Sequence, residues 1–189
     1  MIAFCHTQLA HAQPDRFDWE EVQSAIHANS ALVAQFVALF RLRFDPAATG
    51  REAAYADLHA KTLKAVEDYD TGHGHLDAIR RVVFRCCLTF IDHTLKTNFF
   101  VTEKRALAFR LDPTYLSEIG PEFTSDLPRR RPFGVTFFYG RRGAGYHVGF
   151  SHIARGGWRT IICRTQDELT SNTANLFREV FVLAHTQHL

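Results

Sequence analysis

Two arginines separated by two glycines and a tryptophan form the most suggestive chemical group in this sequence. The segment reads Ala154-Arg155-Gly156-Gly157-Trp158-Arg159. Glycine lets a backbone come close to a small ligand, and arginine can hold a carboxylate through paired hydrogen bonds. The same pattern also suits a tight turn between two strands with solvated arginines. The residues alone leave a carboxylate-binding loop and a plain turn equally open.

A second segment, Gly140-Arg141-Arg142-Gly143-Ala144-Gly145, has the glycine content of a phosphate-binding loop. A dinucleotide-binding turn needs a helix behind it, because the helix N-terminus faces the pyrophosphate. Here the alternation of Tyr146, Val148 and Phe150 predicts a strand instead, and the run 135–139 predicts another strand before the turn. The pattern therefore favours a β-hairpin.

Two histidine pairs have spacings that occur in metal sites. His73 and His75 flank a glycine, and His185 and His188 lie three residues apart in a helical pattern. Neither pair has a third ligand at a suitable spacing, such as a cysteine or a carboxylate. We therefore predict a solvated loop for the first pair and ordinary helix-face histidines for the second, with no metal site.

Clustered arginines next to aromatic residues are one means of binding single-stranded nucleic acid. Arg129-Arg130-Arg131 and Arg141-Arg142 flank the aromatic strand 135–139. The formal net charge is only +2, which favours solvated arginines beside aromatics that fill the core. An alternative stays open, in which the chain is a stand-alone binding or interaction module that uses the arginine-rich hairpin to bind a polyanion or a protein partner.

The composition excludes several classes of protein. With 46% hydrophobic and 22% charged residues, the 189-residue chain resembles ordinary folded proteins, and 17 phenylalanines must be covered. No apolar run approaches the roughly 20 residues that span a bilayer. The first residues lack the basic flank and apolar stretch of a secretory signal. Adjacent Cys86 and Cys87 lie in an apolar helical pattern, so we expect buried thiols and a reducing compartment.

Four amphipathic helices are predicted in the first half of the chain. Asp18 followed by Glu21 resembles a capping box, and Asn29-Ser30 can end that helix and cap the next. Asp45-Pro46 closes the second helix. Thr49 with Glu52 repeats the capping pattern for the third, and the fourth follows Gly72 and Gly74. The apolar stripes begin at Trp19, Leu32, Tyr55 and Leu76, and should pack against one another or against a neighbouring layer.

The second half has mostly strand patterns. Leu107 to Leu111 alternates like a half-buried strand, residues 117–132 suit a surface connection, and Trp158 to Cys163 is a further strand. From Asp167 onward the pattern is helical and reaches Leu189 without a stop signal, as truncation would leave it. The sequence thus predicts an α+β fold: an N-terminal helical segment followed by a small mixed β-sheet with a C-terminal helix.

Several stretches, taken in order and spacing, resemble the large, high-molecular-weight class of NAD-specific glutamate dehydrogenases. The likeness is strongest over residues 95–189. It is carried by Leu95-Lys96-Thr97-Asn98-Phe99-Phe100, Ala108-Phe109-Arg110-Leu111-Asp112-Pro113, Gly145-Tyr146-His147-Val148, Ala154 to Arg159, Arg164-Thr165-Gln166-Asp167 and Ala184-His185-Thr186-Gln187.

The resemblance implies a reaction and a binding site. The reaction is the reversible oxidative deamination of L-glutamate to 2-oxoglutarate and ammonia, with NAD as hydride acceptor. Arg155, Gly156 and Gly157 match the segment that places a cation for the side-chain carboxylate of the substrate, and Arg159 would brace the loop or assist electrostatically. Other branches of the superfamily have lysine in place of Arg155 and an aliphatic residue in place of Trp158.

The resemblance also implies what lies elsewhere. The catalytic lysine, the proton-shuttling carboxylate and the NAD-binding fold follow the position of Leu189 in the family, so we expect a fragment that is inactive alone and binds no cofactor. Residues 1–100 would be a helical segment preceding the catalytic region, and residues 101–189 the start of the substrate domain. The expected partners are the remainder of the dehydrogenase chain and further copies in a homo-oligomer, with neither membrane nor nucleic acid. The expected location is cytoplasmic, or mitochondrial in a eukaryote.

Overall fold

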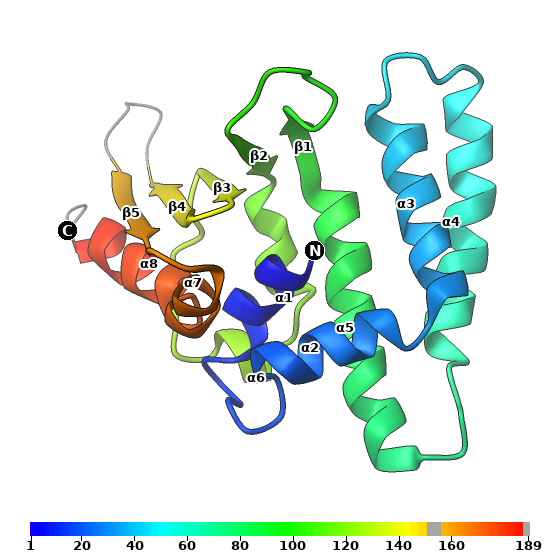
Figure 1. Ribbon diagram of the computed structural model, residues 1–189, viewed down its shortest axis with the longest axis horizontal. Coiled ribbons are helices and arrows are strands. Elements are labelled where there is room, and N and C mark those ends of the chain that lie inside the picture. The colour runs from blue at the N-terminus through cyan, green and yellow to red at the C-terminus, as the bar shows by residue number, and fades with distance from the viewer. Residues whose placement is uncertain (151–155, 187–189) are drawn as a thin grey trace.

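The computed structural model describes residues 1–150 and 156–186 of the chain. A helical half comes first. Its helices are α1 (Ile2–Leu9), α2 (Trp19–His27), α3 (Ser30–Phe44), α4 (Arg51–Glu67) and α5 (Gly74–His93). In Figure 1, α3 and α4 form a hairpin at one side of the molecule, and α5 lies between this hairpin and the sheet.

The second half contains the sheet and two helices that follow it. Its elements are β1 (Thr94–Thr97), β2 (Ala106–Leu111), the 3-10 helix η1 (Pro113–Ser117), α6 (Pro121–Thr124), β3 (Gly134–Gly140), β4 (Gly143–Gly149), β5 (Gly156–Ile162), α7 (Gln166–Asn172) and α8 (Leu176–Thr186). The strands form one sheet in the order β1-β2-β3-β4-β5. The predicted α+β fold is confirmed, although every pairing among the described strands is antiparallel, where we expected a mixed sheet.

Local sequence signals placed several elements correctly. The Asp18 carboxylate accepts a hydrogen bond from the Glu21 backbone N–H at 2.8 Å, and the Asn29 side chain accepts one from Leu32 at 2.9 Å. The hairpin between β3 and β4 turns at Arg141-Arg142, as predicted for the glycine-rich segment. The predicted Thr49 cap is wrong: α4 begins after Gly50, which has a φ of +63° that suits glycine.

Four features of the fold were not predicted. Helix α1 was not foreseen, nor was the short strand β1 directly after α5. The C-terminal helical pattern is divided into α7 and α8. Part of the connection 117–132 is also ordered into α6, where Phe123 is buried.

One face of the sheet is covered by three helices. The Phe4 ring on α1 lies 6.1 Å from that of Phe137 on β3, and Phe90 on α5 lies 4.9 Å from Phe109 on β2. On α8, the Phe177 ring lies 5.1 Å from that of Tyr146 on β4. The hydrophobic core is therefore continuous from the helical half into the sheet.

Cys86 and Cys87 are buried in this core, as expected. Cys5 is buried beside them, and its sulfur lies 3.6 Å from that of Cys87. Burial raises the pKa of the Cys5 thiol.

In the part of the chain that the structure describes, no single helix has the length and apolar character of a membrane span. Helices α2 and α3 meet these two criteria only when they are taken together, and a 90° bend separates them.

Candidate functional site

The register of the sheet determines where the side chains of β5 lie. Tyr146 on β4 pairs with Arg159, so Arg159 ends a cross-strand row that contains the buried Phe109 and Phe137. Successive residues of a strand point to opposite faces. Arg159 and Gly157 therefore lie on the face covered by α8, whereas Trp158 lies on the other face.

Gly157 is the point of closest approach between β5 and α8. A Cβ atom at this position would lie 2.5 Å from the Val180 carbonyl oxygen and 2.8 Å from the Ala184 Cβ. Since even alanine does not fit beside these atoms, glycine is needed here to seat the strand against the helix. The sequence interpretation of this glycine as room for a ligand stays a prediction, and the contact that the structure describes is with the helix.

Arg159 is anchored to the same helix. Its Nε donates to the Glu179 carboxylate at 2.8 Å, with both side chains about half exposed. Beside the pair lies a cavity of about 310 Å³, lined on its polar side by Ser171, Asn172 and Asn175. The guanidinium thus braces β5 on α8 at the rim of a polar hollow.

Trp158 occupies the opposite face and is 65% exposed. Its ring lies 6.1 Å from that of Phe138 and 6.4 Å from the His147 imidazole, both edge-on. Partial burial and the nearby Arg110 lower the pKa of His147. Arg155 lies outside the described residues, and Gly156 begins β5 opposite Gly149. Of the four predicted binding residues, three therefore lie on or at the start of one edge strand.

The other candidates are dispersed. His73 and His75 are exposed at the start of α5, and His185 is on α8, while His188 lies outside the described residues. No group of three or more metal-ligating side chains occurs within residues 1–150 and 156–186. Arg141 and Arg142 are exposed at the tip of the hairpin.

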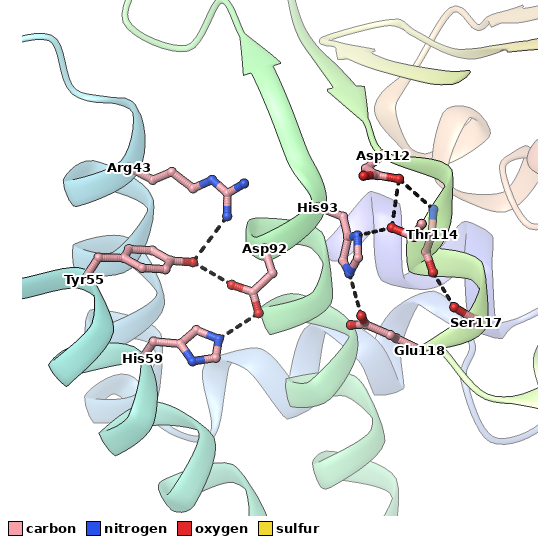
Figure 2. A network of polar contacts seen from close by, with 9 residues as sticks. All are labelled: Arg43, Tyr55, His59, Asp92, His93, Asp112, Thr114, Ser117 and Glu118. Atoms are coloured by element: carbon pink, nitrogen blue, oxygen red, sulfur yellow. Dashed lines mark hydrogen bonds and ion pairs between the residues drawn. The ribbon is translucent and has the colours of Figure 1, made fainter. Parts of the chain in front are cut away.

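A polar network that we did not predict lies at the end of α5 (Figure 2). The Tyr55 hydroxyl donates to one oxygen of Asp92 at 2.5 Å, and the His59 Nε2 lies 2.8 Å from the other. Burial, together with the Asp92 carboxylate, raises the pKa of Tyr55 to about 12, so this hydroxyl stays protonated at neutral pH. The group fastens α4 to α5 through hydrogen bonds.

The next residue, His93, points to the other side of α5 (Figure 2). Its Nδ1 lies 3.0 Å from the Thr114 hydroxyl and its Nε2 lies 2.9 Å from Glu118. Thr114 also donates through its backbone and hydroxyl to Asp112, which lowers the pKa of that carboxyl group. Two patterns in the sequence accompany these networks: Tyr55 and His59 are four residues apart on one helix, and Asp92 and His93 are adjacent at the end of another. Both patterns are common on any helix surface, so neither identified a network.

Comparison with known proteins assigns these elements to a family. The model of a family described as "Bacterial NAD-glutamate dehydrogenase, catalytic domain" matches residues 72–174, which is more than half of the chain and includes every strand. The match therefore covers the sheet and the segment Arg155 to Arg159.

Similar proteins carry related names. The chain is 37% identical over 131 residues to "Glutamate dehydrogenase 2" of Dictyostelium discoideum, covering 64% of this chain and 12% of that protein. It is 41% identical over 93 residues to the "NAD-specific glutamate dehydrogenase" of Saccharomyces cerevisiae, covering 49% and 8% of the two chains. The protein of the same name from Mycobacterium tuberculosis is 30% identical over 138 residues, covering 73% and 8%. The chain spans only about a tenth of the length of these relatives. It belongs to the family of the bacterial NAD-glutamate dehydrogenase catalytic domain.

Proposed function

We propose that this chain is part of an enzyme that oxidatively deaminates L-glutamate to 2-oxoglutarate and ammonia with NAD, and that it supplies part of the glutamate pocket. The family match over residues 72–174 and the names of the relatives support the reaction. Because the chain spans about a tenth of those relatives, the reaction is proposed for the longer protein. The 189 residues alone are expected to be inactive.

The observation that carries the proposed pocket is the seating of β5 on α8. Gly157 touches the backbone of α8, and the charge of Arg159 is balanced by Glu179. This arrangement fixes the strand that begins one residue after Arg155. Since Arg159 already pairs with the Glu179 carboxylate, we propose Arg155 as the cation that binds the side-chain carboxylate of glutamate through paired hydrogen bonds. Gly156 and Gly157 would set its position and Arg159 would brace it.

The glycine-rich segment 140–145 does not have the structure of a dinucleotide-binding turn. The glycine-rich turn at 140–143 leads into strand β4, not into a helix whose N-terminus could face a pyrophosphate. We therefore assign NAD binding to another part of the longer protein and derive no step of hydride transfer from this chain. We likewise propose that residues 1–100 precede the catalytic region and that the substrate domain starts near residue 101, with one shared core joining them.

The pocket can be tested with the chain as it is. In a nuclear magnetic resonance titration of the 189-residue protein with 2-oxoglutarate, we expect chemical-shift changes at the amides of Gly156 to Arg159. The Arg155→Gln variant should remove them. The matched control is Arg141→Gln, which removes an equal charge at the far end of the neighbouring strand β4, and it should leave them unchanged. Shift changes elsewhere than β5, or an equal loss in both variants, would refute the assignment of Arg155.

A further inference from the structure

Three consecutive arginines surround a cavity that lies outside the proposed glutamate pocket. The cavity has a volume of about 340 Å³ and is formed where η1, α6 and the segment before β3 meet α8. Arg129, Arg130 and Arg131 are all exposed and all line it. The other described residues of the lining are Leu116, Ser117, Thr124, Ser125, Leu127, Pro128, Pro132 and Phe181.

None of the described lining residues is acidic, and the carboxylates nearby are already engaged. Asp126 forms an ion pair with the largely buried Arg178, and Glu118 pairs with His93 at 2.9 Å. Asp112 accepts two hydrogen bonds from Thr114. The charge of Arg131 interacts electrostatically with Asp112, but the two side chains form no ion pair among the described residues. Among the residues that the structure describes, the cavity therefore gathers three positive charges without a paired negative charge, unlike Arg159 and Arg178, whose charges are balanced by Glu179 and Asp126.

The backbone that carries these arginines is held at both ends. Before them, the Leu127 N–H donates to the Thr124 carbonyl at 3.0 Å. After them, Pro132 is buried and the Phe133 N–H donates to the Gly149 carbonyl at 2.7 Å. The Arg130 guanidinium also lies 6.0 Å from the centre of the Phe150 ring. A site held in place before binding loses less conformational entropy when its ligand arrives.

The chemistry of the lining identifies the ligand class. Guanidinium groups bind phosphate oxygens in a bidentate manner, and several together suit a ligand with more than one negative charge. Phe181 is only 1% exposed, so the surface that this ring offers to a ligand is small. We propose that this arginine cavity binds the phosphate groups of a small polyanion, such as inorganic pyrophosphate or the diphosphate of a nucleotide. The site shares no residue with Arg155 to Arg159 and does not depend on the proposed reaction.

Isothermal titration of the 189-residue chain with inorganic pyrophosphate at low salt tests the proposal. We expect saturable binding of one ligand per chain. The variant Arg129→Gln/Arg130→Gln/Arg131→Gln should bind at least about tenfold more weakly, since each lost charged hydrogen bond contributes on the order of 1 kcal/mol or more. The matched control, Arg105→Gln/Arg141→Gln/Arg142→Gln, removes the same number of charges near the hairpin tip and should change the affinity by less than about twofold.

Two further arms complete the test. Titration with a nucleoside diphosphate separates the two sources of the ligand: similar affinities for both compounds indicate recognition of the phosphates alone, and a clearly tighter nucleoside diphosphate indicates a nucleotide. Circular dichroism checks that both triple variants are folded. Absence of saturable binding, an equal loss in both triple variants, or equally tight binding of the dicarboxylate glutarate would overturn the proposal.

Discussion

The two sides of α5 are held by different forces. On the sheet side, Phe4, Phe90, Phe137 and Tyr146 are buried and their rings are in contact across four elements. On the other side, α4 has only Thr62 and Val66 buried among its described residues. Its attachment to the end of α5 depends on the hydrogen bonds of Tyr55 and His59 to Asp92.

The difference predicts which part of the molecule unfolds locally at the lowest free energy. Burial of large aromatic side chains contributes more free energy than polar contacts that are still partly hydrated. The side chains of His59 and Asp92 are 29% and 27% exposed, so their interaction is weakened by solvent. Helix α3 still buries Phe36 against Phe84 of α5. We therefore expect α4 to open locally at a lower free energy than the sheet and the helices that cover it.

The largest expected effect comes from filling the contact between β5 and α8. Gly157→Ala should lower the free energy of unfolding by about 3 kcal/mol, at the upper end of overpacking costs, because the nearest atoms include the backbone of Val180 and Ala184 and cannot rotate away. Denaturant unfolding measures this change. Gly149→Ala is the matched control, since its Cβ would meet nothing closer than 3.7 Å. Equal losses in both variants would show that the contact with α8 is not the cause.

An intermediate effect is expected from His6, a buried histidine on the sheet side that bonds to Thr173 at 3.0 Å and has no ion-pair partner among the described residues. Burial lowers its pKa to about 4, although the Asp18 carboxylate partly offsets this. Because the unfolded chain binds a proton more readily, His6 favours folding fully above pH 6.5, and this contribution is lost as the pH falls toward 4. The loss should be about 2 kcal/mol between pH 7.5 and 5.

Denaturant unfolding at the two pH values checks the role of His6. The His6→Gln variant removes the titrating group, so its stability should fall by about 2 kcal/mol less over the same interval than that of the unchanged protein. Carboxylates titrate in both proteins and cancel in this difference. Identical pH slopes would mean that His6 is not the group responsible.

The smallest effect concerns α4 itself. Asp92→Ala removes the acceptor for Tyr55 and His59 and should lower the local opening free energy of α4 by about 1 kcal/mol, a value discounted for solvent exposure. Hydrogen exchange should show faster exchange in α4 with little change in β3. Asp57→Ala breaks the largely exposed pair with Lys61 on the same helix and should have almost no effect. If β3 lost protection as much as α4, the two regions would not be separable.

The features predicted correctly from sequence were those set by neighbours in the chain. Asp18 and Asn29 cap helices because each side chain reaches an N–H three residues later. Helix α1 gave no such sign. Residues 3–9 are all buried and include His6, Thr7 and Gln8, so the helix is covered on every side and has no amphipathic stripe. Its polar groups are satisfied by distant partners: Thr7 and Gln8 hydrogen-bond to the Tyr146 hydroxyl, at 2.6 and 3.2 Å.

The candidate site shows the same division. The order of arginine, glycine and tryptophan marked residues 155–159 as a segment of interest, and residues 72–174 carry the family identity. Only the tertiary structure decided that Gly157 contacts α8, that Arg159 pairs with Glu179, and that the arginines at 129–131 share one cavity. Caps, turns and periodicity depend on residues a few positions apart. Which arginine has a carboxylate partner depends instead on strand register and helix packing, which bring together residues that the sequence leaves 20 or more positions apart.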